Sequence, residues 1–198
     1  MRLYHLPGSR STRALWTLEE IGAPYELALL PGDERRGEEH LRRHPLGRVP
    51  VLELDDGRHV FESGAICLHL ADLHPDAGLL GPVGSTERAL VYQWAFFAFS
   101  ELEGTVFPWM RAKRAGQDLD ALAERFTPVA AALRATLSEG PWLLGDRFTV
   151  ADVLCSGPLG AAFRRGLIDE DGPLRDYLDR AAARPANVRA EAVRVPGP

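Results

Sequence analysis

The chain has 198 residues, a formal net charge of −5 at pH 7 and a sequence pI near 5.7, with 45% hydrophobic and 26% charged residues. This is the composition of a globular protein, and the length accommodates one large domain or two small ones. The acidic balance argues against a nucleic-acid or anionic-membrane partner, because both need a concentrated basic surface. No run of about 18 apolar residues occurs, and Pro7 interrupts the N-terminus before a signal-peptide core develops. We therefore expect a cytoplasmic protein without nucleic-acid or membrane partners.

The two cysteines, Cys67 and Cys155, are far apart in the sequence and form no CxxC pair. They also lack the spacing of metal ligands. We therefore predict that both are small buried residues, with no disulfide and no metal site.

Up to residue 74 the sequence alternates between strand and helix patterns. Residues 2–6 form a short apolar stretch, and after a Pro-Gly-Ser break the segment 11–22 has apolar residues at helical spacing. Residues 25–30 then resemble a second buried strand, which implies a parallel βαβ unit. Residues 49–61 divide around Asp-Asp-Gly into a β-hairpin, and a helix follows to about residue 74. This order is typical of a small mixed sheet covered by helices.

The segment 75–86, PDAGLLGPVGST, is rich in proline and glycine and is the best candidate for a linker. Beyond it the sequence has helical patterns but no convincing strand. We predict a domain at 1–76, a linker at 77–86 and an all-helical domain at 87–198. The helical segments are expected at 87–113, 118–138, 150–163 and 173–184.

Four segments in this order resemble the cytosolic glutathione transferases: LYHLPGSRSTRALWTLEEIG, PLGRVPVLELDDG, FESGAICLHLAD and WLLGDRFTVADV. The LPGS portion resembles the bacterial, Ser-type members. The resemblance implies a thioredoxin-like α/β domain that binds glutathione, followed by an all-α domain. It implies glutathione as co-substrate, no metal or redox cofactor, and the homodimer that is usual in the family.

Ser9 lies between the first strand and the first helix, where a serine is most often a helix N-cap. In the family a Ser, Tyr or Cys at this position donates a hydrogen bond to the glutathione sulfur and stabilises the nucleophilic thiolate. Ser11 could take this role, although LPGS favours Ser9. Neither serine has a neighbouring His–Asp signature and no GxSxG motif is present, which argues against a serine hydrolase.

The resemblance assigns five further residues to glutathione. The main chain of Val49 would pair with the cysteinyl part, next to Pro50, which is cis in the family. Arg48 suits a glutathione carboxylate, although a solvent-facing arginine is an equal alternative. Glu62 would bind the γ-glutamyl ammonium, while the Ser63 hydroxyl and the helix-start amides would bind its carboxylate. The residues alone indicate only that Pro50 opens an edge strand and Ser63 caps a helix.

The second domain contains one structural motif and one candidate pocket. Thr149 to Asp152 fits a capping box at the start of an apolar helix, which identifies the fold rather than a substrate. The family forms its hydrophobic acceptor pocket from the early helices of this domain. Phe107, Trp109 and Met110 are therefore candidates to line it, although aromatic residues in helices usually belong to the core.

Together these features favour a detoxifying glutathione transferase that activates the thiol as thiolate for attack on a small electrophilic, hydrophobic substrate. Two alternatives stay open: a non-catalytic interaction module with the transferase fold, and a glutathione-dependent isomerase or dehalogenase. A reductase on this scaffold would need a cysteine near residue 9, and the chain has none there. Another low-molecular-weight thiol could replace glutathione.

Overall fold

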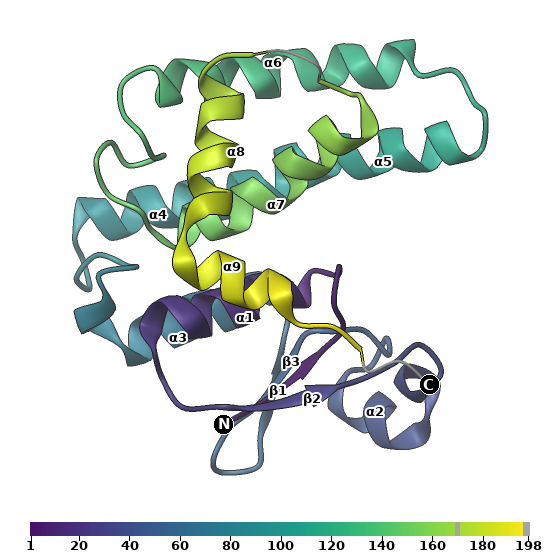
Figure 1. Ribbon diagram of the computed structural model, residues 1–198, viewed down its shortest axis with the longest axis vertical. Helices are drawn as coiled ribbons and strands as arrows, with labels where there is room; N and C mark the ends of the chain where they lie inside the picture. The colour runs from purple at the N-terminus through teal and green to yellow at the C-terminus, as the bar shows by residue number, and fades with distance from the viewer. Residues whose placement is uncertain (169–170, 196–198) are drawn as a thin grey trace. The chain divides into compact units, whose positions relative to one another are not determined.

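The computed structural model describes residues 1–168 and 171–195 (Figure 1). These residues form two compact units. The first, here called the sheet unit, comprises Met1–Gly78 and the C-terminal segment that begins at Ala183; the second, the helical unit, is Leu79–Ala182.

The sheet unit contains a four-stranded mixed sheet with the strand order β2-β1-β3-β4. Strands β1 and β2 are parallel, whereas β3 is antiparallel to both β1 and β4. The parallel βαβ unit and the hairpin that the sequence predicts are therefore confirmed. Leu3 and Leu52 pair in register and are fully buried, so they lie in the core. The strands are β1 (Arg2–His5), β2 (Glu26–Leu29), β3 (Val51–Glu53) and β4 (His59–Phe61).

Helices of the sheet unit pack on this sheet. Helices α1 and α3 contact each other as well as β1 and β3, respectively (Figure 1). Their apolar residues, spaced as in an amphipathic helix, are fully buried: Leu15, Leu18, Ile66 and Leu70. The helices are α1 (Ser11–Ile21), α2 (Glu38–Arg43), α3 (Ser63–Leu73) and α9 (Pro185–Ala192), with short 3₁₀ turns at Glu34–Arg36 and Pro75–Ala77.

Helix α9 differs from the expected organisation, which assigned all of 87–198 to the helical domain. It packs along α1 and groups with the sheet unit. Arg184 donates two hydrogen bonds, of 2.6 and 2.7 Å, to the carboxylate of Glu20 on α1. Small side chains one turn apart permit a close approach of the helix and are buried: Ala186 and Ala190.

The helical unit has α-helices at the segments that the sequence predicts, and its described residues form no regular strand. Helix α7 contacts α4 and α5 and is buried over most of its length, so it forms the centre of this unit. It continues through Pro158 to Arg165, because a proline removes only one ladder hydrogen bond and the surrounding packing supports the helix. The helices are α4 (Thr86–Phe97), α5 (Glu103–Arg114), α6 (Asp120–Leu137), α7 (Val150–Arg165) and α8 (Pro173–Ala183), with a π-helical turn at Ala98–Leu102.

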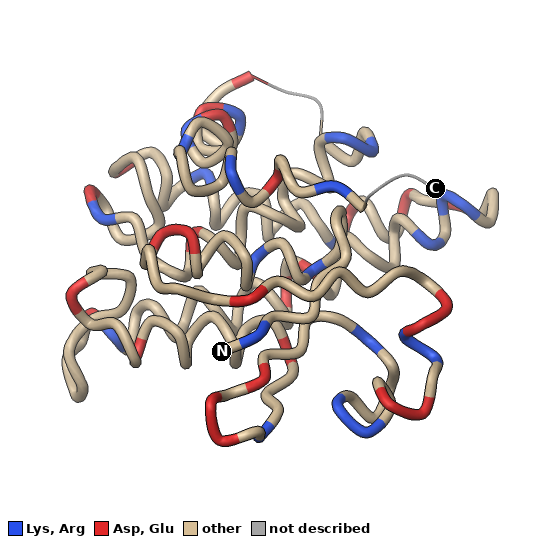
Figure 2. Tube along the Cα trace, turned by 60° about the horizontal axis from the view of Figure 1, so that its bottom comes forward, with Lys and Arg blue, Asp and Glu red and all other residues tan. Residues whose placement is uncertain are grey.

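Charged residues of both signs are interspersed along the chain. Figure 2 shows lysine and arginine interspersed with aspartate and glutamate along the trace. Many form ion pairs between neighbours, such as Arg2 with Glu26 and Arg58 with Asp56. In the described segments, no helix combines the length and the apolar character needed to cross a membrane.

Candidate functional site

Sheet register brings the predicted glutathione residues to one end of the sheet. Tyr4 at the end of β1 pairs with Val51 at the start of β3, and Val51 pairs with Phe61 at the end of β4. The turn after β1, the loop before β3 and the start of α3 therefore emerge side by side. These three segments contain all the predicted thiol and glutathione residues: Ser9, Ser11, Arg48, Val49, Pro50, Glu62 and Ser63.

The two candidate serines lie in the turn between β1 and α1 but differ in access. Ser9 is half-buried, whereas Ser11, the first residue of α1, is 0% exposed. The Ser9 Oγ accepts a hydrogen bond of 3.2 Å from the Ser11 amide at the start of α1, but the N-cap position of this helix is Arg10 and not Ser9. Only Ser9 has surface with which it could contact a ligand directly.

Ser11 is held by polar neighbours on the inner side of the turn. Its Oγ accepts a 3.0 Å hydrogen bond from the Leu6 amide and lies 2.7 Å from the Oγ of Ser9. It also lies 2.7 Å from Nδ1 of His5 at the end of β1. No motif in the sequence singled out His5, although a histidine that ends the strand just before this turn was a usable signal.

His5 is 0% exposed, and burial lowers the pKa of its imidazole. A buried imidazole is stabilised in its neutral form, because a charge is costly away from water. His5 is therefore a neutral hydrogen-bonding group next to Ser11.

The loop before β3 is fixed by a glycine and a buried histidine. Gly47 has φ +58°, and a Cβ there would lie 2.5 Å from the carbonyl oxygen of Arg35, so only glycine fits. His40 is buried, and its Nε2 lies 2.9 Å from the Arg48 carbonyl oxygen, which fixes the main chain of the loop. The side chain of Arg48 is exposed.

The Val49–Pro50 peptide bond is cis, the isomer that the resemblance implies. The ladders that β3 forms with β1 and β4 begin at Val51. Val49 thus precedes the paired part of the strand, and Pro50 is buried just before it.

Glu62 and Ser63 mark the junction between β4 and α3. Glu62 is exposed and has φ +71°, a left-handed conformation that costs a non-glycine residue about 1–3 kcal/mol. It occupies the N-cap position of α3, and no side chain caps this helix. Ser63 is instead the first helical residue, so the expectation that it caps the helix is wrong.

A buried arginine lies next to this helix start. Arg13 on α1 is 6% exposed, and its Nη1 donates a 3.4 Å hydrogen bond to the Oγ of Ser63. Its positive charge and the uncapped amides of α3 both favour an anion at Ser63. Arg13 was missed by the sequence analysis, because its proximity to Ser63 depends on the packing of α1 against α3.

The acceptor-pocket candidates lie on α5 and differ in burial. Trp109 is 3% exposed, as expected for a core residue. The Lys113 Nζ lies 4.8 Å from the centroid of its ring. Phe107 and Met110 are partly exposed and remain pocket candidates.

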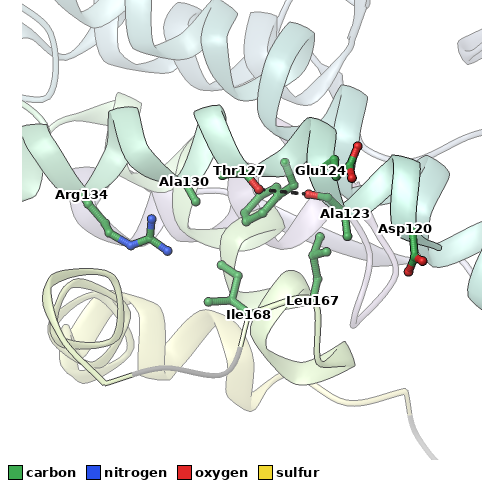
Figure 3. A pocket seen from close by; sticks show the side chains of 9 residues that line it. Asp120, Ala123, Glu124, Thr127, Ala130, Arg134, Leu167 and Ile168 are labelled. Carbon is green, nitrogen blue, oxygen red and sulfur yellow. Dashed lines mark hydrogen bonds between the residues drawn. The ribbon is translucent and has the colours of Figure 1, made fainter.

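A cavity of about 500 Å³ in the helical unit contains none of these three residues. Figure 3 shows it between one face of α6 and two apolar residues after α7, with Arg134 and Asp120 at opposite ends of the row on α6. Its lining is Asp120, Ala123, Glu124, Phe126, Thr127, Ala130, Arg134, Leu167 and Ile168.

The predicted capping box is confirmed at the start of α7. Asp152 is 0% exposed; one carboxylate oxygen accepts a 2.8 Å hydrogen bond from the Thr149 amide and the other a 3.0 Å bond from the Leu143 amide. Burial raises the pKa of Asp152 to about 6. Its carboxylate thus contacts two main-chain amides and, at 3.4 Å, the Thr149 hydroxyl, which is a structural role.

Both cysteines are buried, as predicted. Burial raises the pKa of Cys67 to about 11, so its thiol stays protonated at neutral pH and is a poor nucleophile. Among residues 1–168 and 171–195, no three histidine, cysteine, aspartate or glutamate side chains are grouped so that they could hold a metal ion.

Known proteins are similar to this chain in sequence and in fold. The family described as Glutathione S-transferase, N-terminal domain, matches residues 1–72. Glutathione S-transferase GstA of Escherichia coli O157:H7 is 29% identical over 189 residues, which cover 93% of this chain and 94% of that protein. The structure of a sphingomonad glutathione S-transferase complexed with glutathione is 30% identical with a TM-score of 0.82, covering 96% of this chain and 97% of the other.

A further relative has a different name. Elongation factor 1-gamma of Trypanosoma cruzi is 38% identical over 124 residues, but these cover 62% of this chain and only 30% of that protein. The matches to GstA and to the sphingomonad transferase instead extend over nearly the whole of both chains. On this sequence and structural similarity, the chain belongs to the glutathione S-transferase family.

Proposed function

We propose that this protein is a transferase that binds glutathione at the end of the sheet where Tyr4, Val51 and Phe61 pair, and that it uses the thiolate to attack a small electrophilic, hydrophobic substrate. The sheet register carries this proposal, because it brings a hydroxyl, an unpaired strand start and an anion-binding helix start together. The sphingomonad relative with bound glutathione supports the same ligand.

Each part of glutathione has a chemically matched partner in this arrangement. The exposed carboxylate of Glu62 binds the γ-glutamyl ammonium, while Ser63, with Arg13 behind it, binds the adjacent carboxylate. The main chain of Val49 pairs with the cysteinyl part as an added strand. Arg48 has an exposed guanidinium for the remaining carboxylate.

Ser9 supplies the chemistry in this scheme. Its hydroxyl donates a hydrogen bond to the sulfur, which favours the thiolate over the thiol and lowers the thiol pKa. The thiol proton is lost to solvent, and the thiolate then forms a carbon–sulfur bond with the electrophilic carbon. In a substitution the bond from that carbon to its leaving group breaks and the leaving group departs as an anion; in an addition to an activated double bond the π bond breaks and the product takes a proton from water. Phe107 and Met110 are the candidates to contact an apolar acceptor.

The elongation factor similarity favours a second candidate, an interaction module with the transferase fold and no turnover. The two functions predict different results with glutathione and a general electrophile such as a chlorinated nitroaromatic. A transferase forms the thioether catalytically, whereas an interaction module does not accelerate its formation.

Replacing Glu62 with alanine is expected to weaken glutathione binding about tenfold, at the lower end of the 1.5–3 kcal/mol that a charged hydrogen bond contributes, because Glu62 is exposed. Alanine keeps a Cβ, so the left-handed backbone cost is unchanged and the melting temperature should shift little. Calorimetry with glutathione measures the affinity.

Glu26→Ala is a matched control. Glu26 is also an exposed acid of the sheet unit, but it pairs with Arg2 at the opposite end of the strands. It should leave the affinity unchanged. Equal affinities of the wild type and Glu62→Ala would remove Glu62 from the site, and no glutathione binding by the wild type at millimolar thiol would overturn the proposed function.

A further inference from the structure

The contacts of His5 define its tautomer. Its Nδ1 lies 2.7 Å from the Ser11 Oγ, whereas its Nε2 is buried and, within the part of the chain that the structure describes, has no hydrogen-bond partner. A buried N–H without an acceptor is rarer and more costly than a buried lone pair without a donor. The proton of the neutral ring is therefore on Nδ1, and His5 donates to Ser11.

This donation fixes the direction of the next hydrogen bond. The Ser11 Oγ accepts from His5 and from the Leu6 amide, which fills both of its lone pairs. The Ser9 hydroxyl then cannot donate to Ser11. The Ser11 hydroxyl has two acceptors within reach, the Ser9 Oγ at 2.7 Å and the Leu6 carbonyl oxygen at 3.1 Å. We assign its hydrogen to the closer one, the Ser9 Oγ, because the 2.7 Å contact between the two serines needs a hydrogen between them.

Both lone pairs of the Ser9 Oγ are also occupied by hydrogen bonds. It accepts from the Ser11 hydroxyl and, at 3.2 Å, from the Ser11 amide. Its own hydrogen is directed to the Leu6 carbonyl oxygen at 2.7 Å, which also accepts from the Ser9 amide at 3.2 Å. With this assignment both hydroxyl hydrogens have an acceptor, and neither hydroxyl oxygen accepts more than two hydrogen bonds.

We propose that His5 and Ser11 are positioning residues that hold the Ser9 hydroxyl as a donor toward the sulfur of bound glutathione. This inference rests on the proposed function and adds to the site the two buried residues behind Ser9. With both lone pairs of Ser9 occupied, its hydrogen is the group that can rotate outward. The Leu6 carbonyl retains the Ser9 amide when this happens, so no buried donor loses its acceptor.

If the hydrogen bonds between His5, Ser11 and Ser9 ran in the opposite direction, the Ser9 hydroxyl would not be available to donate to a ligand. If His5 carried its hydrogen on Nε2, Ser11 would donate to Nδ1 and would have a lone pair free to accept from Ser9. The Ser9 hydroxyl would then be drawn inward, away from a ligand. The buried, partner-free Nε2 is what makes that arrangement unfavourable.

The experiment measures the pKa of glutathione bound to each variant by thiolate absorbance. His5→Leu and Ser11→Ala each interrupt the series of hydrogen bonds from His5 through Ser11 to Ser9, at a different point. Each variant should raise the bound thiol pKa by about 0.5–1, because each removes one neutral hydrogen bond. This shift is roughly a three- to tenfold loss of thiolate at neutral pH. His5→Asn can present an amide N–H near the position of Nδ1 and should restore most of the effect. Glutathione affinity should change less than threefold throughout.

A double-mutant cycle separates this role from general packing. In a Ser9→Ala background, His5→Leu should not raise the bound thiol pKa further, because the hydroxyl through which it acts is gone. Additive effects in the cycle, or a wild-type thiol pKa in both His5→Leu and Ser11→Ala, would overturn the proposal. If one of these variants fails to fold, the other still decides the outcome.

The two levels of the hypothesis fail in different ways. A raised thiol pKa in Ser9→Ala without any change in the His5 and Ser11 variants overturns the positioning role of His5 and Ser11 and leaves the proposed function intact. An unchanged thiol pKa in Ser9→Ala, or no glutathione binding by the wild type, overturns the role of Ser9 itself.

Discussion

Replacing Asp152 with alanine is expected to lower the free energy of unfolding by about 2–6 kcal/mol and the melting temperature by roughly 10 °C. The two carboxylate oxygens accept hydrogen bonds from the buried amides of Leu143 and Thr149. Alanine leaves both donors without an acceptor, which costs about 1–3 kcal/mol each; the bond from the Thr149 amide is the capping-box bond. Urea denaturation of the two proteins measures the difference.

Ser85→Ala provides the matched control for a helix cap. The Ser85 Oγ accepts a 3.2 Å hydrogen bond from the Arg88 amide at the start of α4, in a partly exposed position. Its loss should cost only about 1 kcal/mol, because water can reach the amide that is left. Equal losses in the two variants would contradict the buried role of Asp152.

The effect of Asp152 also depends on pH. Burial raises its pKa from 3.8 to about 6, so between these values the folded protein binds more protons than the unfolded chain. The contribution of this group to stability therefore decreases as the pH rises through that window. The difference between the wild type and Asp152→Ala should be larger at about pH 4 than at about pH 7. A constant difference would show that the carboxyl pKa is unshifted.

Ser9→Ala is expected to reduce turnover at neutral pH about 10- to 100-fold while glutathione affinity stays nearly unchanged. The contacts at Glu62, Ser63 and Val49 do not involve the Ser9 hydroxyl, but the thiolate loses its donor. The pKa of the bound thiol therefore rises, and a smaller fraction is ionised near pH 7. The rate should recover as the pH increases past the new thiol pKa.

Ser138→Ala is the control for this comparison. Ser138 is exposed after α6 and its Oγ donates only to the carbonyl oxygen of Ala135, at 2.7 Å. Its pH–rate profile should match that of the wild type. A Ser9→Ala profile identical to that of Ser138→Ala would remove Ser9 from the chemistry.

Local sequence patterns were sufficient for the order of the elements. The Asp-Asp-Gly turn predicted the β3–β4 hairpin, and Thr149 with Asp152 predicted the capping box, because both motifs depend on residues close together in the chain. The resemblance added the glutathione residues, from Ser9 to Ser63. The same local rules were wrong for Ser63, because Glu62 occupies the cap position in a left-handed conformation that residue type alone does not reveal.

The sequence by itself therefore determined the strand–turn–helix around Ser9, the hairpin and the helical second unit, all of which follow from spacing and turn chemistry. Only the tertiary structure decided which side chains support them. Arg13 reaches Ser63 because α1 packs against α3, and α9 joins the sheet unit through Arg184 and Glu20. His5 lies within hydrogen-bond distance of Ser11 only because the turn after β1 brings Ser11 back to the end of the strand. These contacts depend on packing between elements, which the periodicity of a single segment does not encode.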